Sequence, residues 1–331
     1  MNPKIPGMNI NPVIEFEDMM NAVSVSRPLK ARLASAQGEI YSVYDRAINV
    51  LLEDGSLVAF VDHLQGGGPF SITLDLDADF SFRNIPIKEH DRVYLKPNVI
   101  EVGGAIRVQG LNMAKEFDPL PHIQSKELDL DKIQSNLLYL KNFVLRSGRV
   151  DGLADLACLY SPDTRSQAFD GLNRLARFAL LNVMGLLSAI REGDLDRVGF
   201  WSSKLIGLGP GSTPSGDDFL SGLMVGGITA SPEGTRYRKY WKDVSQKIIL
   251  SAEDRTTLVS FEYLKWASEG MGAERVIRAI EALFLGGEMD VEPATGKLLR
   301  MGSTSGVDIA TGILFGCQAA LEHYGFGGSL R

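Results

Sequence analysis

The residues best suited to chemistry lie in two glycine-rich stretches of similar composition. The first reads Gly-Leu-Gly-Pro-Gly-Ser-Thr-Pro-Ser-Gly-Asp-Asp over residues 207–218, and the second reads Gly-Ser-Thr-Ser-Gly-Val-Asp over residues 302–308. Skipping one proline aligns them, and each continues into an apolar segment rich in small residues. Free backbone amides in such a loop, together with the dipole of the following helix, favour an anion or a developing negative charge. The repeat therefore predicts two similar loop–helix junctions that face one site.

The aspartates that follow the glycines have two interpretations. Asp218 and Asp308 occupy matching places in the two stretches. In the first turn of a helix an aspartate satisfies free amides and the dipole, whereas near a bound anion it could hold Mg²⁺ or act as a general base. Both interpretations stay open for Asp218. Asp217 favours a structural role, with Ser215 or Asp217 as the N-cap, and Asp217 and Asp218 are the candidate Mg²⁺ ligands.

A third polar junction lies between the two glycine-rich stretches in the sequence. Residues 251–260 place Arg255, Thr256 and Thr257 just before an apolar helical segment. Hydroxyls at a helix start plus one arginine suit an oxyanion or a carboxylate. The plainer alternative is ordinary capping of that helix by Thr256 or Thr257.

Composition and spacing argue against several classes of protein. The 331 residues carry a net charge of −7 and no basic block, which argues against a general nucleic-acid binder. Residues 211–216 have the glycine spacing of a Walker A loop, but aspartates stand where that loop needs Lys-Ser/Thr. Only two cysteines, no signal sequence and no apolar run long enough to span a bilayer predict a cytosolic protein without a membrane partner.

The hydrophobic period changes near residue 120, which predicts an α+β protein. Short apolar segments of period two fill residues 29–116, and an Asp54-Gly55 turn indicates a hairpin, so we expect a small antiparallel β barrel or sandwich. Residues 123–331 have helical periodicity and carry the glycine-rich loops. Residues 1–28 are interpreted as an N-terminal extension, either a tail or a short docking helix around 14–23.

The apolar faces of the second region predict a series of helices. A long amphipathic one is expected from about 166 to 191. The other expected helices span residues 130–146, 153–159, 195–205, 217–230, 237–252, 257–268, 274–285 and 307–323.

The glycine-rich stretch 207–222 resembles the signature of the AllH-like domain family, which is associated with oxamate carbamoyltransferase. Residues 46–49, 256–264 and 302–308 resemble further blocks of that family in the same order, so the resemblance runs from about residue 30 to 323. One departure is Ser303, where the family pattern Gly-His-Thr-Ser-Gly-x-Asp has histidine. Any imidazole role at this position is therefore absent or moved.

The resemblance implies a subunit that acts with others to transfer a carbamoyl group from carbamoyl phosphate to oxamate, giving oxalurate and phosphate. We expect oxamate, carbamoyl phosphate or phosphate as the small anionic ligand. Asp218, Asp308 and Arg255 are the predicted catalytic or charge-clamping residues, and no cofactor other than Mg²⁺ is indicated. The predicted substrate-binding residues are Gly209, Gly211, Ser212, Thr213, Ser215, Gly216, Thr256, Thr257, Thr304, Ser305 and Gly306.

Two alternatives to this function stay open. The chain could be a non-catalytic assembly subunit whose glycines allow close helix packing or receive a loop of a partner. It could also be a stand-alone enzyme acting on another small acid or phosphate, which the change at Ser303 leaves open.

Overall fold

The computed structural model divides into two compact units, each with its own hydrophobic core. One unit comprises residues up to Val25, Leu29–His63 and Ser71–Lys115, and the other comprises Ser26–Pro28, Leu64–Phe70 and the chain from Glu116 onward. The structure describes residues 18–30, 32–33, 35–123, 129–147, 151–160 and 171–325, with the backbone alone for 323–325.

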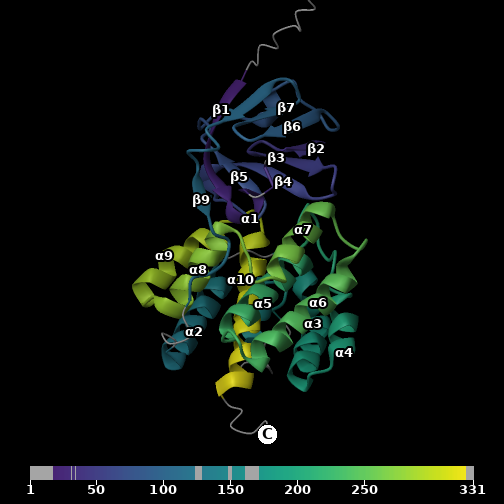
Figure 1. The fold of residues 1–331 in the computed structure, drawn as a ribbon. Coiled ribbons are helices and arrows are strands. Elements are labelled where there is room, and N and C mark those ends of the chain that lie inside the picture. The colour runs from purple at the N-terminus through teal and green to yellow at the C-terminus, as the bar shows by residue number, and fades with distance from the viewer. Residues whose placement is uncertain are drawn as a thin grey trace, which may run out of the picture. The chain divides into compact units, whose positions relative to one another are not determined.

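Eight strands of the described chain close into a β-barrel (Figure 1). Their order around the barrel is β5-β4-β3-β2-β6-β7-β8-β1, and pairing of β1 with β5 closes the ring. Most neighbours are antiparallel, while β1–β8 and β4–β5 are parallel. A ninth short strand, β9 (Lys115–Phe117), joins the sheet beside β1. The barrel strands are β1 (Asp18–Ser26), β2 (Ala36–Val43), β3 (Ala47–Leu52), β4 (Leu57–Asp62), β5 (Ser71–Leu74), β6 (Arg92–Lys96), β7 (Val99–Val102) and β8 (Ile106–Gln109).

The predicted hairpin is confirmed between β3 and β4. Leu51 pairs with Leu57, and Gly55 adopts a φ of 80° that favours glycine. The carboxylate of Asp54 accepts hydrogen bonds from the amide and the hydroxyl of Ser56, at 2.9 and 2.5 Å. The turn therefore holds its own polar groups while the two strands bury their apolar side chains.

The docking helix predicted around residues 14–23 is wrong over its described part. From Asp18 the chain forms β1, which pairs with β8 and β5. Met20 and Val25 are buried in the barrel core because the strand alternates its side chains between the two faces. Residues 14–17 lie outside the described part of the chain.

The second unit is helical, as predicted, so the α+β class is confirmed. Figure 1 shows α10 and α5 side by side in the middle of this unit, with α2, α8 and α9 on one side and α3, α4, α6 and α7 on the other. The helices are α2 (Leu130–Arg146), α3 (Arg174–Glu192), α4 (Leu195–Ser202), α5 (Ser215–Ala230), α6 (Arg236–Ala252), α7 (Leu258–Ala267), α8 (Glu274–Leu285), α9 (Glu288–Leu299) and α10 (Ser305–Gly325), with short helices α1 (Arg27–Lys30) and η4 (Ala154–Tyr160).

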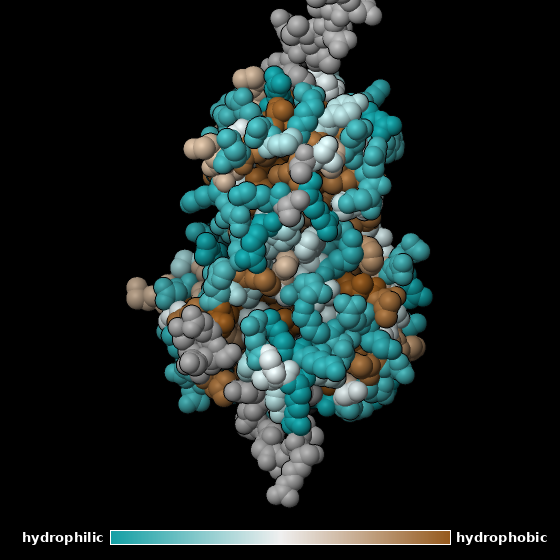
Figure 2. All heavy atoms as spheres, in the orientation of Figure 1, coloured by the Kyte–Doolittle hydropathy of each residue, from teal (hydrophilic) through white to brown (hydrophobic). Residues whose placement is uncertain are grey.

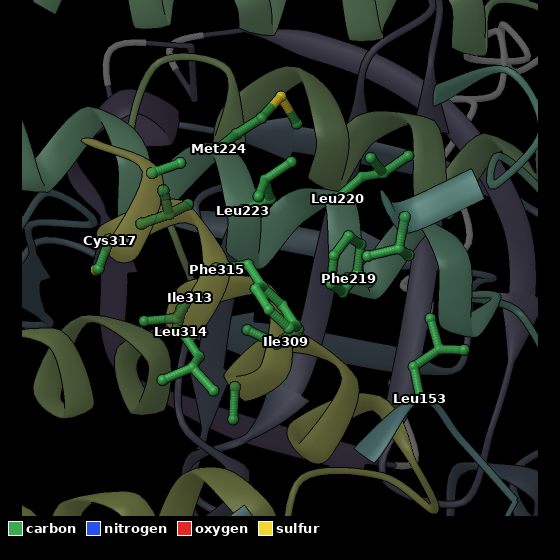
Figure 3. Packing of buried hydrophobic residues seen from close by; sticks show 14 of the residues in the cluster. Leu153, Phe219, Leu220, Leu223, Met224, Ile309, Ile313, Leu314, Phe315 and Cys317 are labelled. Atoms are coloured by element: carbon green, nitrogen blue, oxygen red, sulfur yellow. The ribbon is translucent and has the colours of Figure 1, made fainter. Parts of the chain in front are cut away.

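Glycines let α5 and α10 pack unusually closely. A β-carbon on Gly222 would come closer than 3.0 Å to the carbonyl of Ile309, and one on Gly226 would lie 2.8 Å from the carbonyl oxygen of Ile313. The contacts advance in the same direction along both helices, so the helices are parallel and begin at the same end. Figure 3 shows the apolar side chains around this pair, including Phe219 and Phe315, whose ring centroids are 6.2 Å apart.

Three helix predictions needed correction. The segment predicted as a helix at 153–159 is a 3-10 helix, η4. The long helix expected from 166 begins at Arg174, because Asn173 caps it; residues 166–170 lie outside the described part. Helix α9 was not predicted, since Pro293 within it removes one backbone donor and obscures the helical pattern.

The surface provides little apolar area on the face drawn in Figure 2, where hydrophilic residues dominate and apolar ones form scattered patches. Among the described helices, none combines the length and the apolar content needed to cross a bilayer.

Candidate functional site

The two glycine-rich loops meet in the structure, because the helices that follow them are parallel neighbours. The hydroxyl oxygen of Thr213 lies 3.2 Å from that of Ser305, and the hydroxyl oxygen of Ser215 lies 3.5 Å from that of Thr304. Ser215 of the first loop thus faces Thr304 of the second, and Ser305 of the second faces Thr213 of the first. We call the meeting point of these four hydroxyl side chains the loop junction.

The backbone at the two helix starts is equivalent. The carbonyl of Pro214 accepts the amides of Asp217 and Asp218, and the carbonyl of Thr304 accepts those of Val307 and Asp308. Pro214 is therefore the N-cap of α5, with no side-chain cap, so the predicted capping by Ser215 or Asp217 is wrong.

Two glycines of the predicted anion cradle use their amides inside the fold. The amide of Gly216 donates to the carbonyl of Leu208 at 2.8 Å, and the amide of Gly306 donates to that of Met301 at 2.9 Å. A β-carbon at either position would collide with a backbone carbonyl, of Leu205 or Leu298 respectively. These glycines therefore serve close packing, and their amides are already hydrogen-bonded.

Asp218 lies in the first turn of α5 and Asp308 in the first turn of α10, and both are next to the loop junction. The hydroxyls of Ser305 and Thr213 lie beside the carboxyl group of Asp218 and act to lower its pKa, and those of Ser215 and Thr304 do the same for Asp308. Asp218 is 7% exposed and Asp308 is 0% exposed. Within the described chain, one carboxyl oxygen of each, Oδ2, has no hydrogen-bond partner.

Burial changes the ionisation of both aspartates. Desolvation raises the pKa of Asp308 to about 6. The hydrogen bond that its Oδ1 accepts from the amide of Leu153 at 2.6 Å acts in the opposite direction and lowers the pKa. Desolvation also raises the pKa of Asp218 well above its ordinary value, and the nearby charge of Asp308 adds to this effect. A pKa of about 6 leaves Asp308 largely ionised at neutral pH, whereas the raised pKa of Asp218 favours its protonated form more than in an ordinary aspartate.

The charge of this pair bears on anion binding at the junction. Each helix start contributes roughly half a positive charge, so two together contribute roughly one. One ionised aspartate already balances that charge. An external anion would gain little electrostatic stabilisation from the helix starts alone, and the predicted anion site needs cations from elsewhere.

Asp217 has the structural role that its position suggested. Its Oδ1 accepts the amide of Gly207 at 2.9 Å, while its Oδ2 accepts the hydroxyls of Thr256 and Ser260, the latter at 2.8 Å. Burial raises its pKa, and these hydrogen bonds lower it. The carboxylate joins the first glycine-rich loop to the start of α7, and its oxygens are occupied by protein donors, which argues against a Mg²⁺ ligand.

The third polar junction supports the first loop from outside. Thr257 is the N-cap of α7, as one of the two alternatives predicted, and its hydroxyl donates to the carbonyl of Ser212. The backbone of Arg255 lies against Gly207, whose missing β-carbon makes room for the Arg255 carbonyl. The Arg255 side chain is exposed. Its predicted role as a charge clamp stays a prediction.

A cavity of about 1260 Å³ opens beside the two glycine-rich loops. Leu208 and Pro210 from the first loop and Ser303 and Thr304 from the second form part of its wall. The remaining wall comes from α3 and the segments before it, through Ser147, Asp151, Asn173, Arg174, Leu175, Arg177 and Phe178. Thr304 therefore belongs both to the loop junction and to the cavity.

The arginines of this cavity were missed from the sequence. Arg174 and Arg177 lie in the first turn of α3, where cations oppose the helix dipole. Cations at this unfavourable position indicate a functional role. The sequence did not reveal the position of the two arginines, because the helix was expected to begin at 166. The carboxamide of Asn173 caps α3 and donates to the carbonyl of Gly152 at 2.8 Å, which connects this helix start to the segment beside Asp308.

A fourth loop joins the helical unit near Asp218. Residues Leu64–Phe70 belong to this unit, and the carbonyl of Gly67 accepts the amide of Glu274 at 2.8 Å. A β-carbon on Gly68 would lie 3.4 Å from the hydroxyl of Tyr263. Desolvation raises the pKa of Tyr263 to about 12, with a contribution from Asp218.

Comparison with known families accounts for both units. The family model described as oxamate carbamoyltransferase subunit AllH matches residues 205–317, which include both glycine-rich loops. The model of the AllH family N-terminal domain matches residues 21–115, which include nearly all of the barrel. No solved structure matches the chain. Since the two matches together cover most of the sequence in the expected order, the chain belongs to the AllH family.

Proposed function

We propose that the chain is a subunit of an oxamate carbamoyltransferase and that it binds a small anionic substrate in the cavity beside the loop junction. The observation that supports the proposal is that Arg174 and Arg177 of α3 line the same cavity as Ser303 and Thr304 of a glycine-rich loop. Oxamate and carbamoyl phosphate are both anions that accept hydrogen bonds. Guanidinium groups and hydroxyls are suitable donors for both.

The chemistry of the transfer agrees with this wall. The amide nitrogen of oxamate attacks the carbamoyl carbon, the new C–N bond replaces the C–O bond to phosphate, and the nitrogen loses a proton. Negative charge develops on the carbamoyl oxygen and on the departing phosphate. Fixed donors placed at such charge lower the barrier without reorganising. We assign substrate contact to Arg174, Arg177 and Thr304, and loop positioning to Asp217, Asp218 and Asp308.

The size of the cavity supports a shared active site. Its volume of about 1260 Å³ exceeds the ≈ 300–1,000 Å³ usual for small-ligand pockets, so one small anion would leave most of it filled with water. A second substrate and a segment of another subunit would exclude that water. We therefore propose that the chain supplies part of the site and that other subunits complete it.

Isothermal titration of the purified chain with oxamate, carbamoyl phosphate and phosphate tests the proposal. Arg174→Gln and Arg177→Gln should each weaken the affinity by roughly tenfold, about 1.4 kcal/mol, because each removes a charged donor. Arg191→Gln is the matched control, since Arg191 lies at the other end of α3 and pairs with Glu322 at 3.0 Å. The control should leave the affinity unchanged.

Two other results would count against the proposal. Equal loss of affinity in the Arg191 control would show a general charge effect and no specific site. Absence of anion binding, both by the chain and by its complex with the other subunits, would favour a non-catalytic assembly subunit.

A further inference from the structure

Apart from the hydroxyl of Thr304, the loop junction contains oxygen atoms whose roles are not explained by the proposed anion cavity. Asp218 and Asp308 are not among the described residues that line that cavity. Both carboxyl groups are more than nine-tenths buried, and each retains an Oδ2 without a hydrogen-bond partner in the described chain. A buried acceptor without a donor is costly, so these two oxygens require an explanation.

The two carboxyl groups lie beside the same set of hydroxyls. Ser305 and Thr213 are next to the carboxyl group of Asp218, Ser215 and Thr304 are next to that of Asp308, and the charge of Asp308 acts on Asp218. A hydroxyl that donates its single proton keeps its lone pairs for another partner. The loop junction thus presents two carboxylates and four hydroxyl oxygens to one region. Oxygen atoms of this kind are the ligands of hard cations, with Ca²⁺ taking six to eight of them.

The charges at the loop junction also favour a cation. With both aspartates ionised, the region holds two negative charges against roughly one positive charge from the two helix starts. The excess negative charge needs a proton or a cation.

The number and kind of the ligands indicate the ion. Ca²⁺ takes six to eight oxygen ligands in a flexible geometry, whereas Mg²⁺ demands a near-ideal octahedron and usually keeps several waters. The two carboxyl groups and four hydroxyls of the loop junction therefore suit Ca²⁺ better than Mg²⁺. We propose that Asp218 and Asp308, with the hydroxyls of Thr213, Ser215, Thr304 and Ser305, bind one hard cation of the size of Ca²⁺ and so hold the two loops together.

Other arrangements fit less well. Among the described residues, no three His, Cys, Asp or Glu side chains form a metal-binding group, so any cation at the loop junction would have to take its remaining ligands from the hydroxyls. Asp217 is excluded as a ligand because its two oxygens accept three protein donors. The proposal concerns binding alone and does not depend on carbamoyl transfer.

Calorimetry and thermal unfolding of the chelator-treated full chain test the proposal, with CaCl₂ and MgCl₂ as probes. We expect saturable Ca²⁺ binding that is tighter than Mg²⁺ binding, and a melting temperature that rises with Ca²⁺ concentration. Asp218→Asn and Asp308→Asn should each weaken Ca²⁺ binding at least tenfold. Titration in buffers of different ionisation enthalpy should show release of protons on binding, because the ligands bind the metal in their ionised form.

Two variants make the result decisive. Asp290→Asn is the matched control: Asp290 is also a first-turn aspartate, but it caps α9 through the amide of Gly287. Its Ca²⁺ affinity should equal that of the wild type. If an Asp→Asn chain does not fold, as judged by circular dichroism, Ser305→Ala provides a milder change that should still weaken Ca²⁺ binding. No saturable binding of Ca²⁺, tighter binding of Mg²⁺, or unchanged Ca²⁺ affinity in folded variants of the loop junction would overturn the proposal.

Discussion

Gly222 of α5 packs directly on the backbone of Ile309 in α10, and a β-carbon on Gly222 would come closer than 3.0 Å to the Ile309 carbonyl. Gly312 of α10 has the reciprocal relation to Phe219 of α5. These contacts set the separation of the two helices. Because the glycine-rich loops precede the same helices, the contacts also set the separation of the loops.

Gly222→Ala should therefore destabilise the fold and disturb both loops. Added methyl groups that force backbone shifts in a packed core cost about 1–3 kcal/mol, and here the collision is with backbone. We expect a loss of at least that size in the free energy of unfolding, measured by urea denaturation. Gly199→Ala in α4 is the matched control, since its nearest neighbour would be Ser251 Oγ at 3.4 Å. That change should be neutral or stabilise by up to about 1 kcal/mol, because alanine is the better helix former.

Asp217→Asn should loosen the first glycine-rich loop. The asparagine can still accept the amide of Gly207, but its amide nitrogen cannot accept the hydroxyls of Thr256 and Ser260. Loss of these buried hydrogen bonds to a charged group should cost about 2–4 kcal/mol in the free energy of unfolding. Asp196→Asn, at an exposed side chain bonded to Lys247, should change stability by no more than about 0.5 kcal/mol. Equal effects of the two changes would contradict the structural role of Asp217.

The stability of the folded chain should fall as the pH rises from about 4 to above 6, measured in a chelating buffer. Asp308 has a pKa of about 6 in the folded chain against 3.8 for an unperturbed aspartate, so folding takes up a proton in this range. Above pH 6 the free energy of unfolding should therefore be lower than at pH 4 by up to about 3 kcal/mol. Asp218, whose pKa is also raised by burial, should extend the effect to higher pH.

Asp308→Asn isolates this effect. The variant should gain stability relative to the wild type as the pH rises from 4.5 to 7.5, because it has no proton to lose, while its Oδ1 still accepts the Leu153 amide. Urea denaturation across this pH range gives the difference in free energy. A difference that stays constant with pH would show that Asp308 does not titrate there.

Ser303→His should make anion binding in the cavity pH-dependent. Ser303 lies in the cavity wall with Thr304 and across from α3. An imidazole with a pKa near 6.5 would add positive charge at pH 6 and little at pH 8. We expect phosphate affinity to rise roughly fivefold at pH 6, about 1 kcal/mol, with no change at pH 8. Ser203→His on the exposed end of α4 should show no such dependence.

Local sequence patterns predicted much of the architecture. The Asp54-Gly55 turn gave the β3–β4 hairpin, and the helices at 130–146 and 274–285 were predicted with the bounds that the structure shows. Period and turn chemistry are local properties, so they can be read without a fold. Two failures have local causes as well: Pro293 obscured α9, and the start at Asn173 was missed within an extended helical pattern.

The pairing of the glycine-rich loops was also suggested by the sequence, because both copies end in a small-residue helix. The roles predicted for residues within the loops stay predictions, but the structure shows which of their polar groups already have partners. Asp217 is one of the predicted Mg²⁺ ligands. In the structure its oxygens accept hydrogen bonds from Gly207, ten residues earlier in the chain, and from Thr256 and Ser260 at the start of α7. The arginines of the cavity were not predicted at all.

The sequence alone determined the family, the change from strands to helices and the two loop–helix repeats, since each depends on residues close together in the chain. Only the tertiary structure decided which polar groups already have partners. Whether Asp218 or Asp308 has a free oxygen, and whether Arg174 lies in a cavity wall, depends on side chains contributed by other helices. Burial and hydrogen bonding are properties of these long-range contacts, and they set the charge and the chemistry of each group.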